Sequence, residues 1–451
     1  MTPGARLQAA IELLAEIHGG SAPADRAAAA YFRGRRYIGG KDRRDVIDRV
    51  YAVLRHRARL EWWIARADTS SSPTERLLIV AALALLDGWS ADRIAGAFDG
   101  GQYRPPPLEA REREVARKLV GRKIDDREQP TWVRLEYPQW LEHQLRNLFG
   151  AGLETEMLAL GGEAPLDLRV NTLKATRDSA LGALAESGIE AAPTRLSPIG
   201  LRVHGRPHLA TLPCFRDGLV EVQDEGSQLV ALLADARPGM RVVDFCAGAG
   251  GKTLAMAAAM RNKGHIVACD VLRGRVERAA VRLNRAGVHN VERRGLASER
   301  DPWVKRHAKG FDRVLVDAPC SSVGTWRRNP DAKWRISADD LTGLIDLQRS
   351  ILDSAARLVR PGGRLIYATC SLLPTENAAQ VEWFSGSHPD FAVRPIGDIW
   401  AEAISSVSGG GDCPTTESFL RLTPAAHETD GFFVAVLERR PADADAGTSD
   451  G

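Results

Sequence analysis

Paired cysteines and long hydrophobic runs are missing from this chain, and each absence excludes a class of protein. Its six cysteines are scattered without a C-x-x-C pair, which argues against a zinc ribbon and against a secreted disulfide scaffold. No apolar run approaches the roughly 18 to 20 residues of a membrane span, and the polar residues near the N-terminus do not fit a signal peptide. We therefore expect a cytoplasmic protein with no membrane segment and no metal site. No dimerisation heptad is present, so a monomer is the default expectation.

The composition is 44% hydrophobic over 451 residues, as in a globular protein with room for two or three domains. Residues 1–128 are predicted to form a helical domain, because apolar residues recur at helical spacing, as between Leu7 and Ile17. A polar stretch at 121–129 predicts the linker. Residues 129–217 are predicted to form a small α+β module, in which the alternation from Leu166 to Val170 indicates a strand.

Strands alternate with helices in the third predicted domain, residues 218–440. Segments with a strand pattern alternate along the chain with segments of helical spacing. Strands are expected at 241–245, 265–270, 313–317, 364–369 and 432–437. This rhythm predicts an α/β fold with a doubly wound parallel sheet and an antiparallel element near its end. Residues 441–451 are small and acidic, which favours a disordered tail.

The net charge of +3 hides a basic segment in the helical domain, because residues 31–59 hold ten Lys or Arg against three Asp. The candidates for RNA phosphate contacts are Arg33, Arg35, Arg36, Lys41, Arg43 and Arg44, which are interleaved with Tyr31, Phe32 and Tyr37. A solvated arginine-rich helix would have the same composition. The pattern alone leaves both readings open.

A short apolar strand passes at Asp244 into a glycine-rich turn and then a helix. The turn comprises Cys246, Ala247, Gly248, Ala249, Gly250, Gly251 and Lys252. Cys246 stands where a Walker A loop needs glycine, and Thr253 stands where a dinucleotide fingerprint needs its third glycine. The turn can still bind a ligand, because glycines allow close backbone approach and a helix start offers free N–H groups.

Ligands of open parallel sheets lie beyond the carboxyl ends of the strands, so residues that end strands are site candidates. Asp270 lies about 20 residues beyond the glycine turn, where an acid commonly binds ribose hydroxyls. Asp317, Cys320 and Cys370 follow two further strands. Two thiols and an acid at a nucleoside site suggest covalent catalysis, in which a thiolate attacks an electron-poor ring and an acid protonates it.

Several ordered motifs closely resemble the Sun/RsmB family of S-adenosylmethionine-dependent RNA cytosine-5 methyltransferases. The motifs are Asp244-Phe245-Cys246-Ala247 with Gly250-Gly251-Lys252-Thr253, Asp317-Ala318-Pro319-Cys320-Ser321-Ser322, Arg327-Arg328-Asn329-Pro330-Asp331 with Lys333-Trp334, Tyr367-Ala368-Thr369-Cys370-Ser371 with Glu376-Asn377, and Asp430-Gly431-Phe432-Phe433. Upstream, 222–227 and 168–174 also resemble family motifs. The resemblance covers about residues 130 to 440. Residues 1–128 more loosely resemble the NusB-like RNA-binding domain of the bacterial ribosomal-RNA members.

The resemblance implies a class I methyltransferase domain, with a Rossmann-like sheet, that binds S-adenosyl-L-methionine through residues 246–252, Asp270 and Asp317. Cys370 would attack carbon 6 of cytosine, Asp317 would steady or protonate nitrogen 3, and Cys320 would help release the product. The implied RNA contacts in this part of the chain are Arg169, Asn171, Arg327, Arg328 and Lys333. The implied partner is RNA, with ribosomal RNA favoured over transfer RNA.

The chain departs from the family pattern in two places. Gly248-Ala249 replaces Ala-Pro in the cofactor turn, which preserves a tight turn, and Leu296-Ala297-Ser298 lacks the acidic residue that members often place near the adenine. Three alternatives to the leading reading stay open. A DNA cytosine methyltransferase would use the Pro-Cys thiol of Cys320 as nucleophile, a catalytically silent RNA-binding ribosome-assembly protein would need no turnover, and a P-loop nucleotidase would bind ATP.

Overall fold

The computed structural model describes residues 1–69 and 73–441 and separates two compact units. The helical unit comprises Met1–Glu163 and Trp326–Ile336, and the sheet unit comprises Ala164–Thr325 and the chain from Ser337 onward. Apart from Pro441, the predicted disordered tail lies outside the described residues. These two units are defined by contacts within each of them and do not test the three predicted domains. The boundaries predicted after residues 128 and 217 therefore stay predictions.

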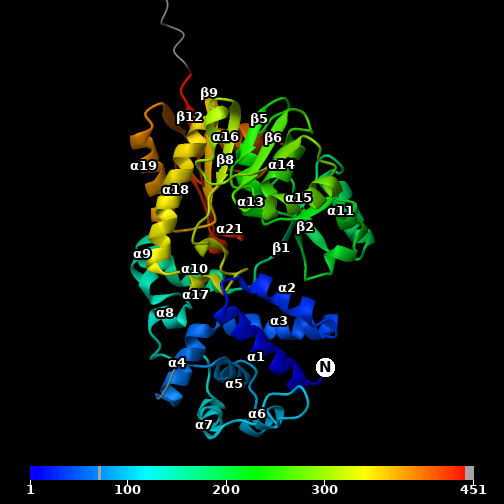
Figure 1. Cartoon of the computed structure of the whole chain (residues 1–451), viewed down its shortest axis with the longest axis vertical. Helices are drawn as coiled ribbons and strands as arrows, with labels where there is room; N and C mark the ends of the chain where they lie inside the picture. The colour runs from blue at the N-terminus through cyan, green and yellow to red at the C-terminus, as the bar shows by residue number, and fades with distance from the viewer. Residues whose placement is uncertain (70–72, 442–451) are drawn as a thin grey trace, which may run out of the picture. The chain divides into compact units, whose positions relative to one another are not determined.

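The helical unit packs short helices around one apolar core (Figure 1). Its helices are α1 (Pro3–Gly19), α2 (Ala24–Gly34), α3 (Gly40–Arg55), α4 (Arg57–Ala67), α5 (Glu75–Leu85), α6 (Ala91–Ala97), α7 (Ala110–Leu119), α8 (Thr131–Arg134), α9 (Glu142–Phe149), α10 (Leu153–Gly161) and α17 (Ala332–Arg335). Thr2 and Thr74 cap α1 and α5 through their hydroxyls. From Leu77 to Leu85 every residue of α5 is buried, so this helix forms the centre of the core.

A four-stranded antiparallel sheet begins the sheet unit, in the order β2-β3-β1-β4. Its strands are β1 (Leu166–Val170), β2 (Ala191–Pro193), β3 (Gly200–Val203) and β4 (Val220–Val222), and α11 (Arg177–Glu186) packs on it. Leu168 pairs with Leu201 on one side and with Val222 on the other. The strand predicted from alternation at residue 166 is confirmed.

The larger sheet has the order β10-β12-β9-β8-β5-β6-β7, with β11 paired to β12. Its strands are β5 (Arg241–Asp244), β6 (His265–Asp270), β7 (Val291–Gly295), β8 (Phe311–Asp317), β9 (Val359–Thr369), β10 (Phe391–Arg394), β11 (Leu420–Leu422) and β12 (Phe432–Arg439). Strands β5 to β9 are parallel neighbours, while β12 runs antiparallel to β9. This arrangement confirms the predicted doubly wound sheet with an antiparallel element near its end.

Alternate residues of each central strand enter different apolar cores, which makes the large sheet the middle of three layers. Val242 packs with α13 (Glu225–Leu233), α14 (Gly251–Ala259) and α15 (Arg273–Ala286). Its neighbour Val243 packs with α16 (Pro302–Arg306), α18 (Ala338–Leu358) and α19 (Ala378–Ser387). Strands buried on both faces are typical of parallel α/β sheets. Within the part of the chain that the structure describes, no helix has the length and hydrophobicity needed to cross a membrane.

The strand order reverses at β5, because the chain passes from β5 to β6 on one side and later returns to β8 on the other. Such a switch point leaves a crevice beyond the carboxyl ends of the two diverging strands. The glycine turn between β5 and α14 lies at this position.

Candidate active site

A cleft of about 590 Å³ opens at the carboxyl ends of β5, β6, β8 and β9. Its lining includes Cys246, Ala247, Gly248, Ala249, Gly251, Lys252, Asp270, Asp317, Cys320 and Cys370. The structure therefore brings together all the predicted catalytic and cofactor residues except Gly250, which lies directly behind the lining as the residue before α14.

The glycine turn needs glycine at two positions. Gly248 and Gly250 have φ angles of 56° and 79°, in the left-handed region that side chains disfavour. Asp270 holds the turn in place, because its carboxylate accepts from Gly248 N–H at 2.9 Å and from Leu272 N–H at 2.7 Å. Asp270, which is predicted to bind the ribose, thus also orients the turn. Each of its carboxylate oxygens keeps a second lone pair that can accept from a ligand.

Arg169 supports the glycine turn from behind. Its Nη1 donates to Gly251 O at 2.7 Å and to Gln223 Oε1 at 2.6 Å, and burial lowers the pKa of Arg169 to about 10. Asn171 Nδ2 donates to Gly218 O and Ala286 O. Both residues are only 2% exposed and their side chains bind backbone and side-chain oxygens of the protein, so the RNA contacts expected for Arg169 and Asn171 stay predictions. Alternation along β1 gives this strand a polar face. In the structure, Arg169 and Asn171 on that face contact the glycine turn and the end of α15.

Asp244 is a buried carboxylate with one unsatisfied oxygen. Thr253 Oγ1 donates to its Oδ2 at 2.6 Å, but Oδ1 has no hydrogen-bond partner among the described residues. Burial raises the pKa of Asp244 to about 7. Because Asp244 lines the cleft, a ligand with N–H donors or a positive charge fits this acceptor.

The two thiols that end β8 and β9 lie in contact, with 3.4 Å between Cys320 Sγ and Cys370 Sγ. The hydrogen bond from Cys320, aided by Ser322 and Lys252, holds the pKa of Cys370 below its usual value despite burial. The same thiol pair and burial raise the pKa of Cys320 well above its usual value. Of the two thiols, Cys370 therefore has the lower pKa and ionises more readily.

Lys252 and Asp317 form an ion pair at 2.6 Å beside these thiols. Burial opposes the charge of Lys252, but the Asp317 carboxylate outweighs it and raises the pKa of Lys252. The Lys252 amine and the Asp317 carboxyl group thus lie at the same end of the cleft as the two thiols.

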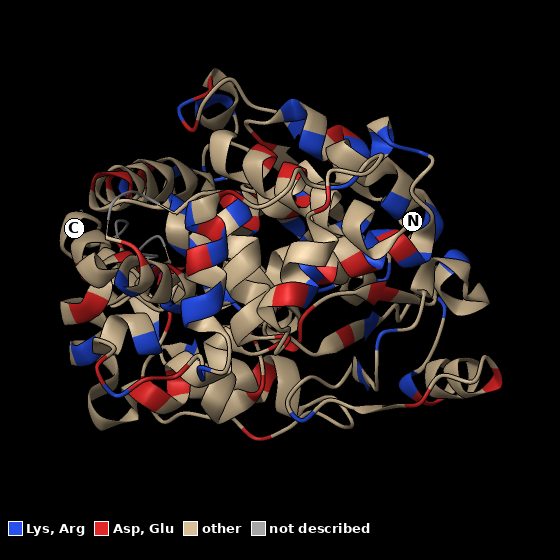
Figure 2. Cartoon of the chain, turned by 90° about the horizontal axis from the view of Figure 1, so that it is seen from below, with Lys and Arg blue, Asp and Glu red and all other residues tan. Residues whose placement is uncertain are grey.

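The basic segment predicted to bind RNA lies in the helical unit and borders a groove between α2 and α3. The groove has a volume of about 660 Å³, and its lining includes Arg33, Arg36 and Arg43 over Phe32 and Tyr51. Basic and acidic residues are interspersed over the chain (Figure 2). By contrast, the cations without an ion pair to any described carboxylate include Arg33, Arg36, Lys41, Arg43 and Arg44. Tyr37, between them, is 74% exposed.

Arg35 has a different environment from the rest of this segment. Its guanidinium lies 3.7 Å from the centre of the Tyr31 ring and pairs with Glu12 and Glu16. The RNA contact expected for Arg35 therefore competes with an internal ion pair.

The segment Trp326–Ile336 packs within the helical unit, although its motif lies between two parts of the sheet unit. Lys333 Nζ donates to Arg55 O at 3.3 Å, and burial lowers the pKa of Lys333 to about 8. Arg55 Nη2 in turn donates to Arg327 O at 2.7 Å. Arg327 is 4% and Lys333 2% exposed, and the RNA contacts expected at these two residues stay predictions. Arg328 is half-buried.

Sequence reasoning missed a carboxylate at the outer part of the cleft. Glu299 lines it together with Leu272, Leu296 and Ile351, and Ser350 Oγ donates to Glu299 at 2.8 Å. Glu299 directly follows Leu296-Ala297-Ser298, the stretch that lacks an acidic residue. A window one residue wider would have included Glu299.

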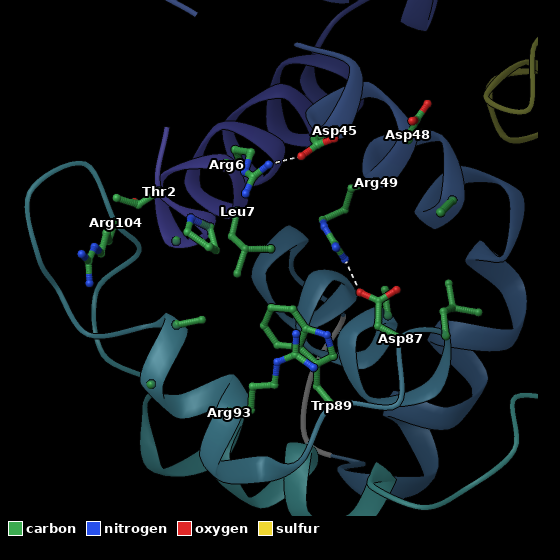
Figure 3. A pocket seen from close by; sticks show the side chains of 17 residues that line it. Thr2, Arg6, Leu7, Asp45, Asp48, Arg49, Asp87, Trp89, Arg93 and Arg104 are labelled. Carbon is green, nitrogen blue, oxygen red and sulfur yellow. Dashed lines mark hydrogen bonds and ion pairs between the residues drawn. The ribbon is translucent and has the colours of Figure 1, made fainter. Parts of the chain in front are cut away.

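A second cavity, of about 810 Å³, lies in the helical unit, where Figure 3 shows its polar wall. Arg6 pairs with Asp45, and Arg49 pairs with Asp87 at 2.6 Å. Trp89 has the Arg93 guanidinium 4.0 Å from its ring centre. Most charged side chains of this cavity are paired with one another, and the described residues that line it include no thiols and no unpaired buried carboxylate like those that line the cleft. No group of three His, Cys, Asp or Glu side chains suited to a metal ion occurs in residues 1–69 and 73–441.

Comparison with protein-family models finds two matches. Residues 231–438 match the model described as 16S rRNA methyltransferase RsmB/F, and residues 137–209 match the RsmF/B-like ferredoxin-like domain. A probable ribosomal RNA small subunit methyltransferase B of Synechocystis sp. is 34% identical over 71% of this chain and 70% of its own length. The ribosomal RNA small subunit methyltransferase B of Pectobacterium atrosepticum is 31% identical over 89% of this chain and 92% of its own length.

Two solved structures share the fold over long stretches. The crystal structure of PH0851 superposes with a TM-score of 0.76 at 27% identity, covering 97% of this chain and 99% of that one. A methyltransferase homologue from Pyrococcus horikoshii superposes with a TM-score of 0.57 at 29% identity, covering 68% of this chain and 97% of that one. The class I methyltransferase fold expected from the sequence is thereby confirmed.

Proposed function

Because the chain belongs to the RsmB/F family of 16S rRNA methyltransferases, we propose that it methylates carbon 5 of a cytosine in small-subunit ribosomal RNA through a covalent cysteine adduct. One observation carries the cytosine-5 chemistry. Two thiols with opposite pKa shifts lie 3.4 Å apart in the cleft that also holds the glycine turn. A nucleophile with a proton donor beside it is what addition to a pyrimidine ring requires.

Cys370 begins the reaction as the nucleophile. Its thiolate forms a bond to carbon 6 of cytosine, and the electron pair of the 5,6 double bond moves toward carbon 5 and the ring nitrogen. Asp317 holds or supplies the proton at nitrogen 3, and Lys252 Nζ pairs with its carboxyl group at 2.6 Å. Carbon 5 thereby becomes electron-rich enough to accept a methyl group.

The methyl donor proposed for the cleft is S-adenosyl-L-methionine, whose sulfonium supplies a methyl group as an electrophile. The residues that would hold it are those of the glycine turn, with Asp270 toward its ribose hydroxyls. The unpaired Oδ1 of Asp244 and the carboxylate of Asp270 fit a cationic ligand rich in donors. After transfer, a base takes the proton from carbon 5, which restores the double bond and expels the Cys370 thiolate. Cys320 is assigned as that base, because a Cys370 sulfur bonded to carbon 6 no longer accepts its hydrogen or raises its pKa, so Cys320 can ionise at that stage.

The RNA strand is proposed to contact the groove between α2 and α3 as well as the cleft. Arg33, Arg36 and Arg43 line it, and Tyr37 is free to stack on a base. Lys41 and Arg44 add exposed charge on the first two turns of α3. Arginines already paired to carboxylates release fewer counterions on binding, so the unpaired set is the better candidate for phosphate contact.

The test is trapping of the covalent adduct. Wild-type protein, Cys320→Ala, Cys370→Ala and the control Cys413→Ala are incubated with S-adenosylmethionine and either small-subunit ribosomal RNA or transfer RNA. Cys413 suits the control because it is half-buried and does not line the cleft. A nuclease-sensitive band on a denaturing gel should accumulate with Cys320→Ala, and Cys370→Ala should give none.

Each departure from that pattern has a definite meaning. An adduct with Cys370→Ala but not with Cys320→Ala would reverse the two roles and refute the assigned nucleophile. Adducts with transfer RNA but not with ribosomal RNA would show that transfer RNA is the substrate and would refute the proposed one. Absence of both adduct and 5-methylcytosine with every RNA would refute the proposed catalysis in favour of a binding protein.

A further inference from the structure

A buried carboxylate lies behind the two thiols and belongs to neither of their turns. Glu376 follows β9 in a short 3-10 turn, Pro374–Glu376, and its side chain is fully buried. It does not line the cleft, so it touches neither cofactor nor RNA. A buried carboxylate usually needs several donors, and the partners of Glu376 reveal its role.

Glu376 binds the turn that carries Cys320. Ser321 N–H donates to Glu376 Oε1 at 2.8 Å, and the Ser321 hydroxyl donates to Glu376 Oε2. Gln348 of α18 donates both to Glu376 Oε1 and to Pro319 O, each at 3.0 Å. The backbone on either side of Cys320 is thus attached to one carboxylate and one amide.

The same network reaches the turn that carries Cys370. The hydroxyls of Ser321 and Ser371, which each follow a cysteine directly, are 3.0 Å apart. Ser371 Oγ also accepts from Leu373 N–H at 3.0 Å, and Gly324 N–H donates to Cys370 O at 2.9 Å. The polar side chains of this network are 5% exposed or less. Water therefore does not compete for these bonds, and the two cysteine turns move as one body.

We propose that Glu376 is a positioning residue that ties the Cys320 and Cys370 turns together and keeps Cys370 as the nucleophile of the pair. The inference rests on the proposed covalent mechanism and adds a reason why one of two touching thiols attacks. The Glu376 charge raises the pKa of Cys320. For Cys370 the two nearby charges oppose each other, because Asp317 raises its pKa and Lys252 lowers it. The hydrogen bond to Cys370 and burial raise the pKa of Cys320 most, and the nearby Glu376 charge adds to them, so Cys320 keeps its hydrogen and donates it to Cys370.

Two substitutions separate the charge of Glu376 from its geometry. Glu376→Gln keeps an acceptor for Ser321 N–H but removes the charge, so the pKa of Cys320 should fall. Ser371→Ala keeps the charge but removes the hydroxyl that joins the two turns, so Cys370 should lose its thiol donor. The matched control is Glu225→Gln, because Glu225 is 1% exposed, accepts from Leu196 N–H and Ser197 N–H, and contacts neither cysteine turn.

The measurement is limited alkylation with iodoacetamide over a pH series, with the Cys320 and Cys370 peptides quantified by mass spectrometry. Wild type should label at Cys370 first. Glu376→Gln should raise the ratio of Cys320 to Cys370 labelling about threefold or more, the change in thiolate fraction that half a pKa unit produces. Ser371→Ala should slow Cys370 labelling near neutral pH, and Glu225→Gln should leave the ratio unchanged.

With Glu376→Gln folded, an unchanged labelling ratio in both variants would overturn the proposal. An equal change in Glu225→Gln would also overturn it, because general loosening would then explain the effect. If Glu376→Gln does not fold, Ser371→Ala decides alone. Wild-type protein that labels as expected but never modifies RNA would refute the proposed function and leave the thiol arrangement standing. In an active enzyme, the turnover number of Glu376→Gln should fall while cofactor affinity stays unchanged.

Discussion

Replacing Asp244 by asparagine should stabilise the protein at alkaline pH, an unusual effect for a residue in a binding cleft. Burial raises the pKa of Asp244 to about 7, about three units above its ordinary value of 3.8. Each unit corresponds to about 1.36 kcal/mol, so ionising this carboxylate in the folded state costs up to about 4 kcal/mol. Asp244→Asn removes this cost and keeps an acceptor for the Thr253 hydroxyl.

The sign of the pH dependence follows from the raised pKa. The folded protein binds the Asp244 proton more tightly than the unfolded chain, so this group favours folding below pH 3.8, and the contribution is lost as the pH rises through about 7. The variant should therefore gain stability over wild type between about pH 5 and about pH 8.5. Urea unfolding of both proteins at the two pH values measures that gain, and other titrating groups cancel in the difference.

Asp167→Asn is the control for this measurement, because Asp167 is also buried but pairs with Arg202 at 2.8 Å. Asp167→Asn removes the charge that pairs with Arg202 and replaces the oxygen that accepts from Arg202 or from Glu225 N–H, so it should destabilise the protein even though Arg202 keeps its ion pair with Glu428. A gain for Asp244→Asn that does not grow with pH would refute the reasoning. The same variant should bind S-adenosylmethionine more weakly in calorimetry, because the cleft loses the charge that faces the ligand.

Three further substitutions test other parts of the structure. Arg169→Met leaves Gly251 O without its donor, at a cost of about 1 to 3 kcal/mol, and should weaken cofactor binding while RNA affinity stays unchanged in a filter-binding assay. Lys333→Met removes the donor to Arg55 O and a positive charge near the buried Glu136, which keeps its ion pair with Arg59, so the free energy of unfolding should fall by about 1 to 3 kcal/mol. Adding Glu136→Gln should recover part of this loss, and an equal loss in the double variant would contradict the coupling. Arg36→Ala should reduce the salt dependence of RNA binding by about one counterion, and an unchanged slope would exclude Arg36 from phosphate contact.

The sequence predicts the cleft well because parallel strands end at a common edge. Asp244, Asp270, Asp317 and Cys370 each end or directly follow a strand, so their meeting depends on topology rather than on the detail of packing. Local patterns also specify the turn between β5 and α14, where glycines occupy the positions of positive φ. For these residues, information within about ten neighbours was sufficient.

Residues that depend on distant partners could not be assigned in this way. The alternation of β1 places Arg169 on a polar face, but only the fold brings Gly251, 82 residues away, onto that face. Lys333 belongs to a motif rich in cations, yet its amine bonds to Arg55 O, 278 residues away. Charge in a sequence indicates that a partner exists, and it does not distinguish a phosphate from a buried carbonyl or carboxylate.

The groups in the cleft are each unfavourable for the folded protein taken alone, and together they suit one kind of ligand. Asp244 has an unsatisfied buried oxygen, and burial raises its pKa to about 7. Cys320 and Cys370 place two thiols in contact where apolar side chains would pack better. A cationic cofactor with many hydrogen-bond donors would give the Asp244 carboxylate its missing partner, and an electron-poor ring would react with the Cys370 thiolate. The stability lost at these positions is therefore best explained by binding and catalysis, because ordinary packing would have selected against each of these groups.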